Sequence, residues 1–175
     1  MSATTTKAPS VWLGCLSCYM EGRLVGRWVP ALGCGALTPA DLHDGEPTTH
    51  DEVIVFDYEG LPSFGHLTPG AAGRWGERYA EVGPGRWGEY IAWVEATGVC
   101  QDGEPPSKAA FDECSCGAWE SFDAFALAYA HDGPLAGAGR EWSAYFDLDQ
   151  WTRDLAYDYD VTNAPGGGVY VFRSL

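Results

Sequence analysis

The stretch SVWLGCLSCYMEGRLVGRWV, residues 10–29, predicts how the N-terminal part of the chain folds. Its two ends are rich in apolar and aromatic residues, and the MEGR segment between them supplies a turn with a glycine. The pattern predicts a β-hairpin over residues 10–31. A further strand is predicted in DEVIVFDYEG, residues 51–60, where side chains alternate between two faces until a glycine ends the run. The N-terminal part should therefore form an antiparallel sheet.

Glycines punctuate the middle of the chain and separate two helical patterns, near residues 73–82 and 87–97. The apolar residues of the second pattern recur at helical spacing, which is more typical of a core than of a cofactor pocket. The segment DGEPPS, residues 102–107, breaks regular structure and predicts a linker.

The C-terminal part combines strand and helix patterns. The segment FDECSCGAWE, residues 111–120, alternates like a strand, and Ser121 can cap the helix that follows. A second helix is predicted to open at Asp147 with a capping-box arrangement, and its apolar stripe extends to Tyr159. The chain closes with a glycine turn and a short strand, VYVF, residues 169–172. Together these patterns predict an α+β fold of three small units: an N-terminal sheet unit (1–61), a helical middle unit (62–107) and an acidic C-terminal α+β unit (108–175).

Negative charge is the most unusual property of the composition. The chain holds 25 acidic and 10 basic residues, and the acids are scattered through the sequence instead of forming a tail. Residues 109–175 are the most acidic part, with three basic and eleven acidic groups. Because 46% of residues are hydrophobic, the chain should fold and carry its acids on a surface.

An acidic surface repels nucleic acid and anionic lipid. The charge therefore predicts a basic protein partner, no direct nucleic-acid binding and no membrane binding. A solvated face that only keeps the protein soluble is the alternative interpretation.

The cysteines form two closely spaced pairs, Cys15 with Cys18 and Cys114 with Cys116. A zinc site or small metal-binding domain that uses both pairs is one hypothesis. Against it, the first pair falls in a predicted strand, where residues three apart point to opposite faces. We therefore expect buried thiols, no metal and no cofactor. The histidines lack the i,i+4 spacing of a helical metal pair and are expected at the surface: His43, His50, His66 and His131.

The sequence offers little for catalysis. Asp57 and Glu59 lie two residues apart on a predicted strand, as a general acid and base would, but no nucleophile, phosphate loop or oriented Ser/His pair accompanies them. We expect no enzyme and no catalytic residue. The chain has no 18-residue apolar run and no secretory signal pattern, so a cytoplasmic protein is expected.

Four separated blocks of sequence resemble the ArdA family of antirestriction proteins. The first contains Y-x-x-G-R-L-x-G-R-W, residues 19–28, and the second is DYEG, residues 57–60. The third and fourth are GAWESFDAFALAYAHD, residues 117–132, and YFDLDQWTRDL, residues 145–155. They occur in the family's order, and the resemblance spans roughly residues 11–173.

This resemblance implies an elongated, three-part homodimer that performs no chemistry. Such proteins imitate the bend and charge of B-form DNA and occupy the DNA cleft in the methyltransferase core of type I restriction-modification enzymes. They are carried by mobile genetic elements and protect incoming DNA from cleavage. B-DNA carries about one negative charge per 1.7 Å, so the excess acids of two chains match on the order of 15 base pairs.

Acidic side chains are the candidates for groups that replace DNA phosphates. In the C-terminal third they are Asp147, Asp149, Asp154, Asp158 and Asp160, all expected on the last predicted helix, and then Asp112, Glu113, Glu120 and Asp123. In the N-terminal unit they are Glu21, Asp51, Glu52, Asp57 and Glu59.

Two features depart from the family pattern: the cysteine pairs and the Gly, Pro and His-rich loop at residues 32–50. Within this loop the Thr38-Pro39 pair predicts one short helix. An acidic adaptor that binds another basic DNA-handling protein stays open as an alternative function.

Overall fold

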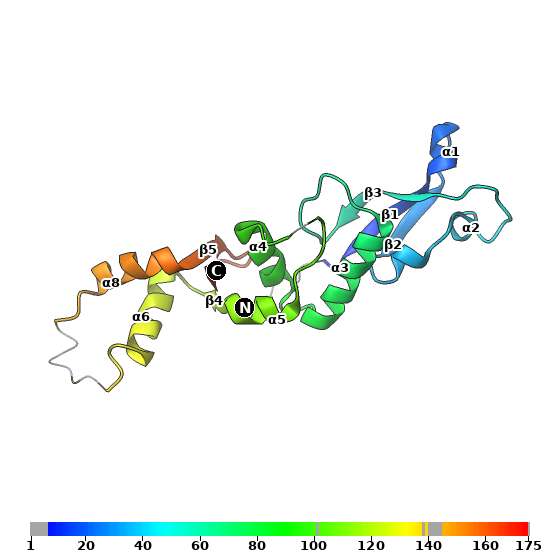
Figure 1. The fold of residues 1–175 in the computed structure, drawn as a ribbon. Helices are drawn as coiled ribbons and strands as arrows, with labels where there is room; N and C mark the ends of the chain where they lie inside the picture. Colours follow the sequence, from blue (N-terminus) through cyan, green and yellow to red (C-terminus); the bar gives the residue numbers. More distant parts are fainter. Residues whose placement is uncertain (1–6, 101, 138, 140–144, 175) are drawn as a thin grey trace. The chain divides into compact units, whose positions relative to one another are not determined.

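A computed structural model describes residues 7–100, 102–137, 139 and 145–174. The described residues form two three-stranded antiparallel sheets and several helices, which confirms the predicted α+β fold (Figure 1). The chain separates into two compact units, with the boundary between Lys108 and Ala109. We call them the N-terminal unit and the C-terminal unit. The division of the first unit near residue 61 stays a prediction.

The N-terminal sheet consists of β1 (Ser10–Cys15), β2 (Gly26–Pro30) and β3 (Val53–Glu59), with β1 in the centre. All neighbouring strands are antiparallel, and Trp12 of β1 lies opposite Trp28 of β2. The pairing confirms the predicted hairpin and the strand predicted in residues 51–60.

The first strand is shorter than predicted. It ends at Cys15, and Leu16–Met20 form a short helix, α1. The partner strand begins only at Gly26, so residues 16–25 extend past the paired part of the hairpin. Glu21, Gly22 and Arg23 donate backbone hydrogen bonds within this segment, and the Leu16 N–H donates to Glu52 O over 3.1 Å. The prediction that the strand runs through Cys18 is therefore wrong, because Cys18 lies on α1.

The loop between β2 and β3 contains a 3₁₀ turn, η1 (Cys34–Ala36), and the helix α2 (Pro39–Leu42). The Thr38 backbone N–H donates to the Asp41 carboxylate over 2.7 Å, which caps the first turn. This confirms the short helix predicted after Thr38, and it places His43 at the C-terminal end of α2.

The two predicted middle helices are present as α3 (Pro69–Val82) and α4 (Trp87–Thr97). Helix α3 begins earlier than predicted because the Thr68 hydroxyl accepts a hydrogen bond from the Ala71 N–H, and Pro69 occupies the first helical position. Gly76 of α3 packs so closely that an added Cβ would lie 2.2 Å from the Leu32 backbone nitrogen.

Large aromatic side chains form the core below these helices. Trp75, Trp87 and Tyr90 are fully buried, and the rings of Trp87 and Tyr90 stack with centroids 5.2 Å apart. The segment predicted as a linker is bonded to this core, since Trp75 Nε1 donates to Gly103 O over 2.7 Å and the Tyr90 hydroxyl donates to Pro106 O over 2.6 Å. Residues 102–107 therefore pack against α3 and α4, just before the boundary between the units.

The C-terminal unit begins with α5 (Lys108–Cys114), whose first residue lies at the boundary, and continues with β4 (Ser115–Trp119) and α6 (Phe122–Asp132). It ends with α8 (Leu148–Leu155), the 3₁₀ turn η2 (Ala156–Asp158), β5 (Tyr159–Asn163) and β6 (Val169–Arg173). The sheet order is β4-β6-β5, all antiparallel. The helix predicted after Ser121 and the closing strand are confirmed, and the Ser121 hydroxyl caps α6.

Two predicted elements of this unit are wrong in extent. The strand predicted over residues 111–120 starts only at Ser115, because Phe111 and Cys114 are buried together on one side of α5 at helical spacing. The last helix stops at Leu155, and Tyr159 starts a strand that pairs with β6. Tyr159 is still buried in the core that Leu155 joins, so its burial was predicted correctly and its backbone was not.

Candidate functional site

The acids predicted to replace DNA phosphates lie on the surface of both units. All of them are exposed except Glu59 and Asp160, which are half-buried. This distribution places carboxylates where a basic partner can reach them. It also means that the candidate acids are not concentrated at one place on the surface.

The start of α8 carries the densest group of these acids. Asp147 is the N-cap and accepts a hydrogen bond from the Gln150 N–H over 2.9 Å. Asp154, one turn further along, accepts a hydrogen bond from the Gln150 side chain over 2.7 Å. Asp149 and Asp123, from α8 and α6, line one shallow hollow together with Leu148, Thr152 and Arg153. The fold thus brings together two carboxylates that are far apart in the sequence.

Asp158 and Asp160 do not lie on this helix, contrary to the prediction. Asp158 belongs to η2 and Asp160 to β5, because the chain turns into the sheet after Leu155. The Asp160 carboxylate accepts a hydrogen bond from the Ser174 hydroxyl over 3.0 Å. The remaining candidates of this unit are exposed, two on α5 and one between β4 and α6: Asp112, Glu113 and Glu120.

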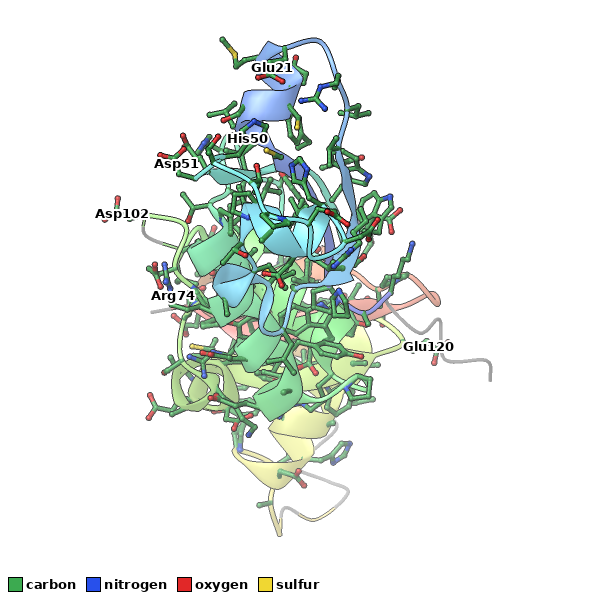
Figure 2. The ribbon with its side chains drawn as sticks, turned by 90° about the vertical axis from the view of Figure 1, so that its right-hand side faces the viewer. Glu21, His50, Asp51, Arg74, Asp102 and Glu120 are labelled. Carbon is green, nitrogen blue, oxygen red and sulfur yellow. The ribbon has the colours of Figure 1, made fainter. Side chains whose placement is uncertain are left out.

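In the N-terminal unit, two of the candidate acids form ion pairs within the chain. The Glu21 carboxylate pairs with Arg23 at 2.5 Å, and the hydrogen bond from this guanidinium lowers the pKa of Glu21. Glu59 pairs with Lys7. Asp51 and Glu52 are exposed just before β3, and the Asp57 carboxylate accepts a hydrogen bond from the neighbouring Tyr58 N–H. Figure 2 shows Glu21 and Asp51 near His50 in this unit.

Basic side chains of the N-terminal unit are neutralised locally. Besides the two pairs above, four further arginines pair with acids of the same unit: Arg27 with Asp44, Arg74 with Glu104, Arg78 with Glu81 and Arg86 with Glu89. In the C-terminal unit, Glu120, Asp123, Asp147, Asp149, Asp154, Asp158 and Asp160 form no ion pair with any Lys, Arg or His that the structure describes. The C-terminal unit therefore presents more uncompensated negative charge.

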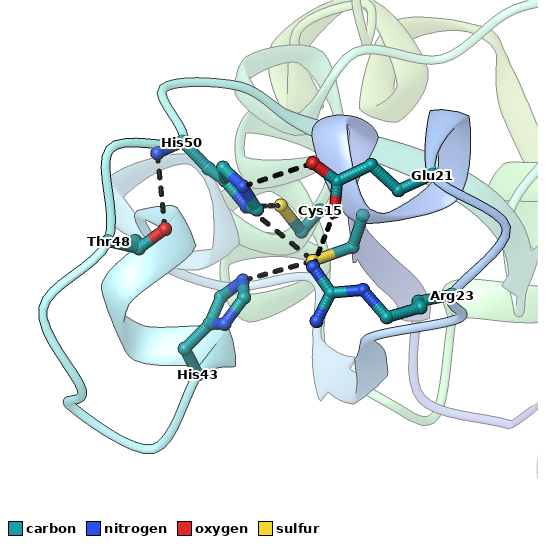
Figure 3. A network of polar contacts seen from close by, with 7 residues as sticks. Cys15, Glu21, Arg23, His43, Thr48 and His50 are labelled. Carbon is teal, nitrogen blue, oxygen red and sulfur yellow. Dashed lines mark hydrogen bonds and ion pairs between the residues drawn. The ribbon is translucent and has the colours of Figure 1, made fainter.

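A second group of side chains gathers at the end of β1. Cys15, Cys18, His43 and His50 place their sulfur and ring nitrogen atoms within 4.8 Å of one another (Figure 3). Both cysteines are fully buried and both histidines are half-buried. Burial, together with the Cys15 thiol beside it, raises the pKa of Cys18.

This group corrects two expectations from the sequence. The thiols converge because the strand ends at Cys15 and the helical turn of α1 carries Cys18 back to the same side. His43 and His50 are half-buried instead of fully exposed, and each has a ring nitrogen within 3.5 Å of a cysteine sulfur. The signal was the C-x₂-C pair together with two histidines seven positions apart in the following loop. The zinc hypothesis considered from the sequence instead combined these thiols with Cys114 and Cys116, which join no such group among the residues that the structure describes.

A comparison with known protein families finds a match over most of the chain. The model of the family described as "Antirestriction protein (ArdA)" matches residues 11–170, nearly the whole chain. No curated protein matches the sequence. Among the described residues, no helix is long and apolar enough to cross a membrane.

Proposed function

The chain belongs to the ArdA family of antirestriction proteins, and from this premise we propose that it inhibits a type I restriction-modification enzyme by occupying its DNA-binding cleft. It would do so as a DNA mimic, with carboxylates in place of phosphates. The DNA protected in this way is that of the mobile element that carries the protein. The family is one of inhibitors, so the proposal includes no catalytic step.

The proposal rests mainly on the acidic side chains of the C-terminal unit, which are exposed and outnumber the basic side chains. Residues 109–175 have eleven acidic and three basic groups, and the described acids from Glu120 to Asp160 lack ion pairs with described basic residues. Like charges at this density repel one another and cost stability. Binding to a basic cleft would relieve this repulsion. A partner of this kind therefore explains why the unit carries so many acidic residues despite their cost in stability.

A folded scaffold makes the mimic effective. Asp147 and Asp154 are held in place by hydrogen bonds to Gln150, and Asp160 by Ser174. Carboxylates fixed in advance lose less conformational entropy on binding than the same charges on a flexible tail. Each exposed charge pair contributes only about 0.2–1 kcal/mol, so affinity must come from many pairs at once.

A homodimer is part of the proposal because of the amount of charge. One chain carries a formal charge of −15. At about one phosphate charge per 1.7 Å of duplex, one chain replaces on the order of 7 base pairs and two chains replace on the order of 15. Two chains thus carry enough charge to replace a duplex of the size of a recognition site, whereas one chain replaces about half of it.

A competition assay tests the proposal. Labelled duplex DNA is bound to a type I methyltransferase core, and the purified protein is titrated in at low and at moderate salt. We expect stoichiometric displacement of the DNA that weakens as salt rises, because both ligands use the same basic residues.

Two other outcomes would contradict the proposal. Binding to the methyltransferase core without displacement of DNA would place the interface outside the cleft. No binding at micromolar protein, with binding to another basic DNA-handling protein, would favour the acidic adaptor instead.

A further inference from the structure

The four convergent donor atoms at the end of β1 form a set that suits a metal ion. We propose that Cys15, Cys18, His43 and His50 bind one Zn²⁺ ion as a structural Cys₂His₂ site. The ligands come from three places in the chain: the end of β1, helix α1, and the two ends of the segment between α2 and β3.

Three of the six distances between donor atoms are close to the edges of a tetrahedral site. His50 Nδ1 lies 3.2 Å from Cys15 Sγ and 3.5 Å from Cys18 Sγ, and His43 Nε2 lies 3.5 Å from Cys18 Sγ. Zinc bonds of about 2.3 Å to sulfur and about 2.0–2.1 Å to nitrogen, at tetrahedral angles, give sulfur–nitrogen edges of about 3.6 Å. The side chains therefore surround a position that a zinc ion can take, and all four donor atoms lie within 4.8 Å of one another.

Hydrogen bonding alone explains this arrangement less well. A neutral imidazole offers one lone pair, on one ring nitrogen, and accepts one well-aligned hydrogen bond. His50 Nδ1 nevertheless faces two sulfur atoms at similar distances. A lone pair directed between the two sulfurs points at the centre of the group, where a cation would bind all four ligands.

The chemistry of the ligands selects zinc. Two thiols and two imidazoles, closed on all four positions, are the donor set of structural zinc sites. On binding, each cysteine loses its proton to solvent, and each histidine coordinates as the neutral ring. Two thiolates and one Zn²⁺ sum to zero charge, so the site leaves the net charge of the surrounding acidic surface unchanged.

Glu21 supplies the contact that orients one ligand. Its Oε1 lies 3.9 Å from His50 Nε2, whereas the sulfurs contact the other ring nitrogen, Nδ1 (Figure 3). This separation is longer than a hydrogen bond, but a small side-chain movement would let the carboxylate accept the Nε2 proton and leave Nδ1 for the metal. Hydrogen-bonded partners of this kind typically change metal affinity by about 10–100-fold. Glu21 is thus a positioning residue for the site.

The site ties a long loop to the sheet. Residues 43–50 hold few backbone hydrogen bonds of regular structure, and the metal would fix both ends of this segment against α1 and β1. Asp51 and Glu52 follow directly and are exposed. The zinc would therefore also set the position of two acids of the proposed interface, although the site itself does not depend on the DNA-mimic proposal.

Metal analysis of the full-length protein tests the inference. The protein is produced with added zinc, purified with a reductant and without chelator, and analysed by mass spectrometry for metals. We expect about one zinc per chain, with a dissociation constant on the order of nanomolar or tighter. Replacement by Co²⁺ should give the intense visible bands of a tetrahedral thiolate complex.

Matched variants locate the site. Cys18→Ser and His50→Ala should lose the metal, whereas Cys34→Ser, a buried cysteine bonded to Pro69 O, and His66→Ala, an exposed histidine, should keep it. Glu21→Gln should keep one zinc per chain with an affinity about 10–100-fold weaker. Circular dichroism checks that each variant is folded.

Several results would overturn the inference. One is wild-type protein that holds less than about one zinc per ten chains and gives no tetrahedral Co²⁺ spectrum. Another is equal metal loss in His50→Ala and His66→Ala. The wild-type Co²⁺ spectrum decides the question even if the cysteine variants do not fold.

Discussion

The two units carry similar negative charge in different ways. The N-terminal unit pairs six of its Lys and Arg residues with its own acids, and it also holds the cysteine and histidine group. The C-terminal unit carries a net charge of −8 in 67 residues, and the described acids from Glu120 to Asp160 face solvent or partly solvent without such pairs. In the N-terminal unit, many charged side chains therefore interact with one another. In the C-terminal unit, the carboxylates are available to the partner that we propose.

Removal of the proposed metal should give the largest effect, and only in the N-terminal unit. A structural zinc contributes about 10–16 kcal/mol to the folding of small peptides, and we expect several kcal/mol here because the unit also has an aromatic core. Hydrogen exchange with and without a strong chelator should show lost protection in β1, β2 and β3. Equal loss of protection in β4 to β6 would contradict this difference between the units.

Neutralisation of several C-terminal acids should give the next largest effect, on affinity. We choose five exposed residues for replacement by their amides: Glu120, Asp123, Asp149, Asp154 and Asp158. At about 0.2–1 kcal/mol for each lost pair, affinity for the methyltransferase core should fall by at least about fivefold, and its salt dependence should flatten.

The matched control changes to amides five exposed acids of the N-terminal unit that are not candidates for the interface: Asp44, Glu46, Glu77, Glu81 and Glu104. We expect a smaller loss of affinity, because three of these acids already pair with arginines of the same unit. A single change, such as Asp154→Asn, should weaken binding by well under tenfold. A single acid whose loss abolishes binding would contradict a distributed interface.

Gly76→Ala should destabilise the N-terminal unit by about 1–3 kcal/mol, since the new Cβ would lie 2.2 Å from the Leu32 nitrogen and force the loop away from α3. Gly70→Ala, in the same helix, is the control. Its Cβ would meet only the end of Arg74 at 3.6 Å, so it should be neutral or slightly stabilising. Denaturant unfolding measures both, and equal stabilities of the two variants would contradict the close packing.

Two substitutions of Asp147 distinguish its role as a helix cap from its role as a negative charge. Of the changes proposed, these should have the smallest effect. Asp147→Ala should lower the free energy of unfolding by about 1 kcal/mol because the cap to Gln150 is lost. Asp147→Asn should keep the cap and the stability while it removes the charge. If both variants lose stability equally in thermal unfolding, the N-cap hydrogen bond does not explain the contribution of Asp147 to stability.

The sequence predicted the elements whose signals are local. The capping residues Thr38 and Ser121 and the alternation in residues 51–60 gave helices and strands that the structure confirms. The errors lie where tertiary pairing decides the backbone. Tyr159 continues a helical stripe by spacing but pairs with Arg173 in the sheet, and Cys18 continues an apolar strand but has no partner strand beside it.

The candidate functional sites also divide into features with local sequence signals and features that only the fold determines. Exposure of the acids followed from their charge, whereas the cysteine and histidine group required the fold to end a strand at Cys15 and to return a loop to it. No periodicity connects Cys18 with His50, which lie 32 positions apart. Only the short spacing of each pair was visible in advance.

The salt dependence of binding tests the central claim most directly. The dissociation constant of the wild-type protein and the methyltransferase core is measured over a series of salt concentrations, beside that of duplex DNA. Our account predicts that both affinities fall steeply with salt, and that the C-terminal amide variant gives a shallower slope than wild type. A wild-type affinity that stays constant with salt would contradict DNA mimicry by surface carboxylates.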